Sequence, residues 1–262
     1  KDIKVIGIPK TIDNDLTNTY FCPGYGSAAK FVATCIREMA LDADVYDREI
    51  ITIVEVMGRD SGFLAAASAL ARDKVINAPD LIYLPEVPFE ENVFLRDVER
   101  VFNKNKGKVF IVTSEGIKNK SGNYVYLRDA KTDSFGNIQM GGVGSYLEYL
   151  VKENFTNRVK VIEFSIIQRC AAHAASLVDN QVAVMVGKAG VEKILNGISD
   201  VMISIEKTDN GFEIGTVPLS KVANYTKSFP VEWIDNDNRW VTKEAIEYML
   251  PLIQGQVDIP YE

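Results

Sequence analysis

Short runs of β-branched and other apolar residues recur along the chain, and each ends in a polar or glycine-rich segment. Such runs cover residues 5–8, 50–56, 109–112 and 159–164. Four to eight apolar residues bounded by turn residues are typical of buried strands. Because these runs alternate with helical patterns, the sequence predicts an α/β fold in which a mainly parallel sheet is flanked by helices.

Helical patterns fill much of the chain between these runs. Apolar residues that recur every three or four positions predict helices over residues 27–41, 90–102 and 182–195, and residues 63–72 are rich in the helix formers Ala and Leu. We expect Ser27 to cap the first of these helices. The polar ends of the strands should then gather at the carboxyl edge of the sheet, where open α/β folds bind their ligands.

Glycine marks two further turns. Residues 209–211, Asp-Asn-Gly, separate two apolar runs, which predicts a hairpin and an antiparallel edge on the sheet. Gly141, Gly142 and Gly144 precede a helical stretch. They fit either a phosphate cradle or a simple turn into the helix, and the turn is the commoner use.

Composition is that of an ordinary globular protein, with 262 residues of which 47% are hydrophobic and 25% are charged. This length predicts one large or two small domains. The net charge of −7 argues against nucleic-acid binding, and no apolar run reaches the roughly 18 residues of a membrane span. Three cysteines without a CxxC pair favour a reducing compartment. We therefore expect a cytoplasmic protein that binds neither nucleic acid nor membranes.

The loop that directly follows the first predicted strand carries the most informative chemistry. It reads Pro-Lys-Thr-Ile-Asp-Asn-Asp over residues 9–15. In phosphoryl transfer, Lys10 would neutralise phosphate oxygens, Asp13 would accept a hydroxyl proton and Asp15 would hold magnesium. The same residues also fit an Asx-type turn without catalytic function. A calcium loop is excluded, because its twelfth position would be Gly24 instead of Glu.

This loop, together with Val-Glu-Val-Met-Gly-Arg at residues 54–59, resembles the paired signatures of the phosphofructokinases. Residues 114–116, Ser-Glu-Gly, and residues 168–169, Gln-Arg, follow in the order of the family. The resemblance covers nearly the whole chain. It implies a phosphotransferase of glycolysis that uses Mg²⁺ and phosphorylates the 1-hydroxyl of fructose 6-phosphate, which gives fructose 1,6-bisphosphate. It also implies a homo-oligomer, either a dimer or a tetramer.

The resemblance assigns catalytic functions to four residues of the two signatures. Asp13 matches the catalytic base of the family, and Thr11 matches a contact to the transferring phosphoryl group. Asp15 is similar to the residue near the metal. Arg59 matches an arginine that stabilises charge during the transfer.

The resemblance also implies a sugar-phosphate pocket. Met57 and Gly58 match positions that line the sugar, and Glu115 matches a residue that bonds the sugar hydroxyls. Arg169 matches a ligand of the 6-phosphate. These residue types suit the chemistry, because a guanidinium fork binds phosphate and a carboxylate accepts from hydroxyls.

Lys10 bears on the phosphoryl donor. Family members that use ATP usually have Gly at this position, whereas members that use pyrophosphate resemble this sequence in having Lys. A lysine would occupy the space of the nucleotide's α-phosphate and would offer its charge to pyrophosphate. Pyrophosphate is therefore the expected donor, with ATP as the alternative.

Three positions depart from the family pattern. Ile166 stands where a His or Tyr is usual, and Ile50 and Lys160 stand where bacterial relatives have arginines that reach the site of a neighbouring subunit. Lys160, which takes the place of one of these arginines, is included among the expected substrate-binding residues. Ile166 favours a noncatalytic sugar-phosphate-binding regulatory subunit as a second alternative, whereas the intact Asp13, Asp15 and Arg59 argue against it.

Family resemblance divides the chain into two similar lobes, with the site between them. Residues 1–26 and 168–218 would belong to the lobe that binds the phosphoryl donor, and residues 27–167 and 219–262 to the sugar-phosphate lobe. The chain begins at Lys1, only four residues before the first strand, and lacks the glycine-rich loop that opens full-length members. We therefore expect a fragment with an incomplete first lobe, and we expect this chain by itself to be inactive.

Overall fold

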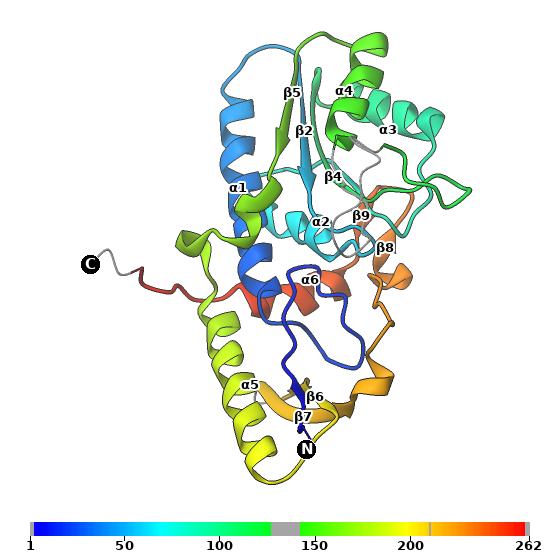
Figure 1. Ribbon diagram of the computed structural model, residues 1–262. Coiled ribbons are helices and arrows are strands. Elements are labelled where there is room, and N and C mark those ends of the chain that lie inside the picture. Colours follow the sequence, from blue (N-terminus) through cyan, green and yellow to red (C-terminus); the bar gives the residue numbers. More distant parts are fainter. Residues whose placement is uncertain (1–2, 127–141, 210, 260–262) are drawn as a thin grey trace.

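The larger of the two main sheets is four-stranded and entirely parallel. A computed structural model describes residues 3–126, 142–209 and 211–259. The strand order is β3-β4-β2-β5, with bounds β2 Ile50–Val56, β3 Leu81–Tyr83, β4 Lys108–Ser114 and β5 Val159–Glu163. Figure 1 shows this sheet in the upper half of the molecule. The predicted α/β fold with a parallel sheet and flanking helices is confirmed.

The second sheet has three strands in the order β1-β6-β7, with bounds β1 Ile6–Gly7, β6 Val201–Thr208 and β7 Gly211–Pro218. Strand β1 runs parallel to β6, whereas β7 pairs antiparallel with β6. The expected antiparallel edge is thus present. Thr208 pairs with Gly211 across the predicted turn, of which Asn210 lies outside the described residues.

Six α-helices cover the sheets or connect them. Their bounds are α1 Tyr25–Asp44, α2 Phe63–Ala67, α3 Glu91–Lys104, α4 Val143–Asn154, α5 Leu177–Leu195 and α6 Lys243–Met249 in the described part of the chain. Helix α6 lies between the two main sheets in Figure 1. A further small sheet pairs β8, Ile234–Asp235, with β9, Trp240–Val241. None of the described helices has the length and apolar character needed to cross a membrane.

The expected capping function of Ser27 is wrong. Helix α1 begins two residues earlier, after Gly24, and no side chain of its own segment caps it. Instead, the Asp179 carboxylate of helix α5 accepts hydrogen bonds from the backbone N–H groups of Gly24 and Ser27 and from the Ser27 hydroxyl. An acidic side chain there favours the positive end of the helix dipole. Ser27 therefore does not cap its own helix. Its hydroxyl donates to a carboxylate that comes from a distant helix.

Both faces of the parallel sheet are buried, which explains the continuous apolar run of β2. Ile51 and Ile53 belong to one core cluster, together with side chains of α3 and α4. Val54 and Val56 belong to another cluster, which also includes Ile203 of the smaller sheet. Side chains alternate between the two faces of a strand, so a strand covered on both faces is apolar throughout. The shared core holds the two sheets together around the ends of their strands.

Candidate active site

The loop after β1 is held by a buried asparagine inside the predicted motif. The Asn14 side-chain amide donates to the Tyr248 hydroxyl at 2.7 Å, and its carbonyl oxygen accepts from the backbone N–H of Cys22 at 2.9 Å. The backbone N–H of Asp13 donates to the Thr11 hydroxyl oxygen at 3.1 Å. Sequence reasoning included Asn14 in the motif but gave it no function. Its bonds fix the loop on which Asp13 is carried.

The segments after β2 and β4 lie against each other at the carboxyl edge of the large sheet. The ladder register pairs Val56 with Ser114, so both strands end at the same level. The Ser114 hydroxyl donates to the carbonyl of Gly58, and the backbone N–H of Glu115 donates to the carbonyl of Val56 at 2.9 Å. This pairing brings the motif residues after β2 beside Glu115.

Asp13 lies in a cluster of charges that come from both sheets. The pKa of Asp13 is raised to about 6. Burial is the largest cause, and the charge of Asp15 is the next. The positive charges of Arg59 and Lys10 act in the opposite direction. These effects require Asp15, Arg59 and Lys10 each to lie near Asp13. The structure therefore brings together Lys10, Asp13 and Asp15 after β1 with Arg59 after β2.

Glu115 completes this charge cluster from the end of β4. Burial raises its pKa to about 7, and the nearby charge of Asp13 is the next largest cause. Arg59 lowers the pKa of Glu115, as it lowers the pKa of Asp13. Within the described part of the chain, the buried Nε of Arg59 has no hydrogen-bond partner. The charges of Asp13, Glu115 and Arg59 thus act on one another where the loops from the two sheets meet.

Met57 and Gly58 reach the same edge, whereas no hydrogen bond or ion pair ties the Arg169 side chain to the described residues of the cluster. The backbone N–H of Met57 donates to the Gln168 side-chain oxygen at 3.2 Å, and Gln168 is buried. Arg169 is the last residue of the short 3-10 helix Ser165–Arg169 and is exposed. The Arg169 side chain has no hydrogen bond or ion pair to another described residue. The expectation that it binds the 6-phosphate stays a prediction.

Lys160 lies near the opposite end of the sheet. Its partner in the ladder is Thr52, close to the start of β2, and its ammonium group is 2.9 Å from a carboxylate oxygen of Asp42 in the last turn of α1. The chain therefore does not bring Lys160 to its own charge cluster. A substrate contact of Lys160 remains a prediction about the site of a neighbouring subunit.

Three charged residues near the cluster were missed in the sequence. Asp60 forms an ion pair with Lys118, with 2.5 Å between the carboxylate oxygen and Nζ. The charge of Asp60 raises the pKa of Asp13. The charge of Lys227 lowers the pKa of Asp15, but burial has the larger effect and raises this pKa. Glu86 accepts a hydrogen bond from the backbone N–H of Gly62. Asp60 directly follows Arg59 and was within reach of motif reasoning, whereas Lys227 and Glu86 lie outside every motif.

Asp13 and Asp15 are the carboxylates of the cluster that could contribute to a magnesium site. In the described residues, no group of three or more His, Cys, Asp or Glu side chains is placed to hold a metal by itself. Magnesium in phosphoryl-transfer sites is usually bound by one or two carboxylates together with substrate phosphates. The repulsion between Asp13 and Asp15 supports this arrangement, because a cation between them would relieve it.

Gly142 and Gly144, the two described glycines before α4, do not offer a free phosphate cradle. The backbone N–H groups of Gly142 and Gly144 donate to the two carboxylate oxygens of Glu55, at 3.1 and 2.7 Å. Gly141 lies outside the described residues. The Glu55 carboxylate of β2 thus occupies the place where a bound anion would accept these hydrogen bonds. The interpretation as a turn into a helix is the one that fits.

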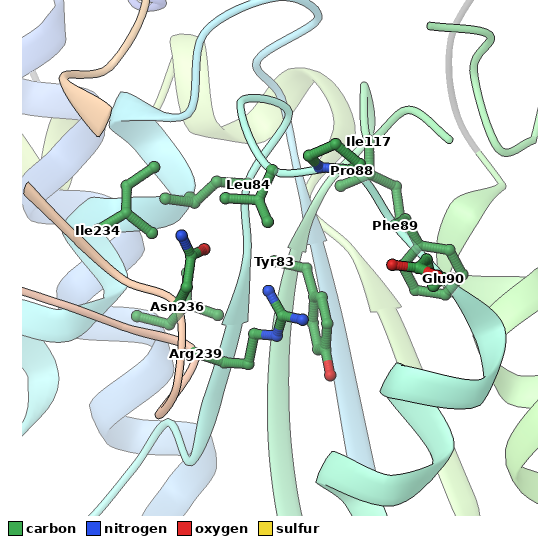
Figure 2. Close-up of a pocket in the computed structure, with 11 residues that line it drawn as sticks. Tyr83, Leu84, Pro88, Phe89, Glu90, Ile117, Ile234, Asn236 and Arg239 are labelled. Carbon is green, nitrogen blue, oxygen red and sulfur yellow. The ribbon is translucent and has the colours of Figure 1, made fainter. Parts of the chain in front are cut away.

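A pocket beside the β8–β9 hairpin is separate from the charge cluster. Figure 2 shows its lining, with the Arg239 guanidinium beside the Tyr83 ring, at 5.7 Å from the ring centre. Leu84, Phe89 and Ile117 make most of the remaining wall apolar. The free space, about 10 Å³, suits at most one water molecule. A sugar phosphate does not fit there.

Comparisons with known proteins agree with the motifs. A family model described as Phosphofructokinase matches residues 1–194. Pyrophosphate–fructose 6-phosphate 1-phosphotransferase of Xanthomonas campestris pv. campestris (strain B100) is 41% identical over 263 residues, which cover 98% of this chain and 62% of the relative. The protein of the same name from Methylococcus capsulatus is 38% identical, over 99% of this chain and 62% of its own length.

A solved structure has the same fold as this chain. The crystal structure of pyrophosphate-dependent phosphofructokinase from Nitrosospira multiformis is similar with a TM-score of 0.87 at 33% sequence identity. The match covers 100% of this chain and 63% of that protein. The chain therefore spans less than two thirds of the length of these relatives.

Proposed function

The chain belongs to the phosphofructokinase family, and we propose that the whole protein transfers a phosphoryl group from pyrophosphate to the 1-hydroxyl of fructose 6-phosphate. The observation that carries this proposal is the charge cluster between the sheets. Lys10, Asp13 and Asp15 enter it from the loop after β1, whereas Arg59 and Glu115 enter it from the ends of β2 and β4. Phosphoryl transfer needs little beyond such positioning and charge stabilisation.

Asp13 is the proposed general base. A pKa of about 6 leaves its carboxylate mostly ionised at neutral pH, yet still basic enough to accept the proton of the sugar hydroxyl. The Thr11 hydroxyl, which accepts from the Asp13 backbone N–H, would contact the transferring group. The charge of Arg59 acts on Asp13, and its buried Nε has no hydrogen-bond partner among the described residues, which suits Arg59 to stabilise the charge that develops on the phosphoryl oxygens.

Asp15 is the proposed neighbour of Mg²⁺. When bound, the ion would neutralise charge on the phosphates of the donor. Lys10 would bind phosphate oxygens of pyrophosphate. Its side chain is exposed, and its positive charge lowers the pKa of the nearby Asp13.

The sugar phosphate would lie over the ends of β2 and β4. Met57 and Gly58 would line the sugar, and Glu115 would accept hydrogen bonds from its hydroxyls, which would favour the ionised carboxylate. Arg169 would bind the 6-phosphate. Lys160 would act in the site of a neighbouring subunit, which requires a homo-oligomer.

The two sheets support the division into lobes. We assign residues 1–26 and 168–218, which include the β1-β6-β7 sheet, to the donor side. Residues 27–167 and 219–262, which include the parallel sheet, form the sugar side.

The three cysteines are free, and a cytoplasmic location stays a prediction.

Coupled assays of the whole protein test this function. Fructose 6-phosphate and Mg²⁺ are supplied with either pyrophosphate or ATP, and the formation of fructose 1,6-bisphosphate is followed. We expect turnover with pyrophosphate and little with ATP. Faster turnover with ATP would contradict the choice of donor. Binding of fructose 6-phosphate without turnover of either donor would favour the noncatalytic subunit.

A further inference from the structure

A short segment between the second sheet and β8 connects the two loops of the proposed site. We define this segment, residues 226–229, as the strap. The backbone N–H of Lys227 donates to the carbonyl of Asp15 at 2.6 Å, and Thr226 forms a bridge with Leu16. One end of the strap is thus bonded to the loop that carries Asp13 and Asp15.

The Lys227 side chain strengthens this connection. Its ammonium group donates to the backbone carbonyls of Thr19 and Tyr20, each at 3.2 Å. It also lies 5.3 Å from the centre of the Phe63 ring, within reach of a cation–π interaction. A single lysine therefore contacts the loop of Asp15 at three backbone positions.

The other end of the strap reaches the loop that carries Arg59. One carboxylate oxygen of Glu86 accepts from the backbone N–H of Phe229 at 2.8 Å and from that of Gly62 at 2.9 Å. The ring of Phe229 is buried and packs edge-on against Phe63, with ring centres 5.1 Å apart. Glu86 thus joins the strap to the residues that directly follow Arg59.

We propose that Lys227 and Glu86 are positioning residues, which act through the strap to hold the Asp13 loop and the Arg59 loop at a fixed separation. The proposal rests on the proposed function for its catalytic consequence. Taking an ammonium group out of water is costly, and an apolar side chain would fill the same space without that cost. Lys227 compensates through its bonds to the loop carbonyls and its charge opposite Asp15.

Fixed separation matters because catalysis here depends on geometry. A displacement of about 1 Å at a reacting group lowers the rate by roughly 10²-fold. Asp13 and Arg59 come from different sheets, so no single element fixes their distance. The strap supplies a direct chain of hydrogen bonds from one loop to the other.

Hydrogen–deuterium exchange of the whole protein tests the strap without any assay of activity. In Lys227→Met, the amides of residues 13–20 should exchange about 10-fold or more faster, because the loop loses two side-chain donors. The matched control is Lys221→Met, since Lys221 is an exposed lysine of the preceding segment whose side chain has no bond in the described structure. Unchanged protection of residues 13–20 in Lys227→Met would overturn the proposal.

Kinetics then test the consequence for catalysis. We expect Lys227→Met to lower kcat for the pyrophosphate reaction by about 10- to 100-fold, with the KM for fructose 6-phosphate within about 3-fold of the wild type. Lys221→Met should behave as the wild type. If the wild type is active and Lys227→Met keeps its kcat, the strap has no positioning function. If the wild type itself is inactive, the proposed function fails, and the exchange experiment still decides about the strap.

A second pair of variants covers the case in which Lys227→Met does not fold. Glu86→Leu removes the oxygen that accepts from Gly62 and Phe229, whereas Glu86→Gln keeps one oxygen in the same place. We expect Glu86→Leu to lower kcat by about 10-fold or more and Glu86→Gln to restore most of it. Equal kcat values in both variants would count against the proposal.

Discussion

Gly116 packs so closely against the backbone of Arg59 that a β-carbon at Gly116 would lie 1.8 Å from the Arg59 carbonyl oxygen. No side chain, not even a methyl group, has room at this position. The contact joins the segment after β4 to the segment after β2. The placement of Arg59 beside Glu115 therefore depends on a glycine at residue 116.

Gly116→Ala should displace the Arg59 loop. The methyl group would meet backbone atoms that have no flexible end to give way, so we expect a loss of about 1–3 kcal/mol in the free energy of unfolding. Activity should fall by roughly 10²-fold, since Arg59 would be misplaced. Urea denaturation and kcat/KM measure the two effects. The control is Gly187→Ala in α5, where nothing lies within 4 Å and where Ala should stabilise by about 0.5–1 kcal/mol. Similar behaviour of both variants would contradict the packing argument.

Glu115 should make stability depend on pH. Its pKa is about 7 in the folded chain, whereas a Glu in the unfolded chain has a pKa of about 4.3. Because the folded value is the higher one, the folded state binds the extra proton, and stability falls as pH rises from about 4.3 to 7. Glu115→Gln removes this loss, so the variant should be more stable than the wild type above pH 7, by about 1–3 kcal/mol.

Denaturation at pH 4.5 and pH 8 checks this effect. The difference between Glu115→Gln and the wild type should be small at the lower pH and large at the higher one. Glu99→Gln changes an exposed carboxylate of α3 and serves as the control. A Glu115→Gln variant that loses stability at pH 8 would mean that the ionised carboxylate is favoured in the fold, which is the opposite of our prediction.

The local pattern of the sequence was sufficient for the elements that bury a continuous apolar run. Strand β2 is predicted and observed over the same seven residues, because its β-branched side chains are buried on both faces. Strand β3 was missed, since three residues are too few to give a period. The cap of α1 was assigned wrongly because the group that satisfies its N-terminus, Asp179, comes from another helix.

The candidate site divides in the same way. Asp13 and Arg59 follow predicted strands, so the rule that ligands bind at strand ends pointed to the two loops whose charges act on each other in the structure. Lys227 and Glu86 follow no such rule, because their functions depend on the tertiary fold. Lys227, for instance, is 208 residues from the Thr19 carbonyl that it binds. No local pattern could identify that contact.

Lys10→Gly tests the choice of donor. The variant loses a charged contact to pyrophosphate worth about 1.5–3 kcal/mol, which corresponds to a rise of roughly 10- to 150-fold in the KM for pyrophosphate. The KM for fructose 6-phosphate should stay nearly constant, because that substrate lies at the ends of β2 and β4. Initial rates with each substrate varied in turn separate the two constants. An effect confined to fructose 6-phosphate would mean that Lys10 faces the sugar instead of the donor.

Asp13→Asn tests the proposed base with a minimal change of shape. The amide cannot accept the hydroxyl proton as a carboxylate does, so kcat should fall by roughly 10² to 10⁴. The affinity for fructose 6-phosphate, measured by calorimetry, should be nearly intact. A variant that keeps its kcat would falsify the assignment. A variant that loses mainly affinity would make Asp13 a binding residue.

Lys160 offers a test of a site shared between subunits. It lies far from the charge cluster of its own chain and pairs with Asp42, so only another subunit could present it to a substrate. We expect Lys160→Ala to raise the KM for fructose 6-phosphate by about 10-fold or more, since a charged contact to phosphate is lost. Mixed oligomers of Lys160→Ala and Asp13→Asn subunits then separate the two explanations. A site with the intact Asp13 of one chain and the intact Lys160 of the other would recover a normal KM in part of the population. If the mixed oligomers show only the properties of the two parent variants, Lys160 does not act across an interface, and its pairing with Asp42 is its whole function.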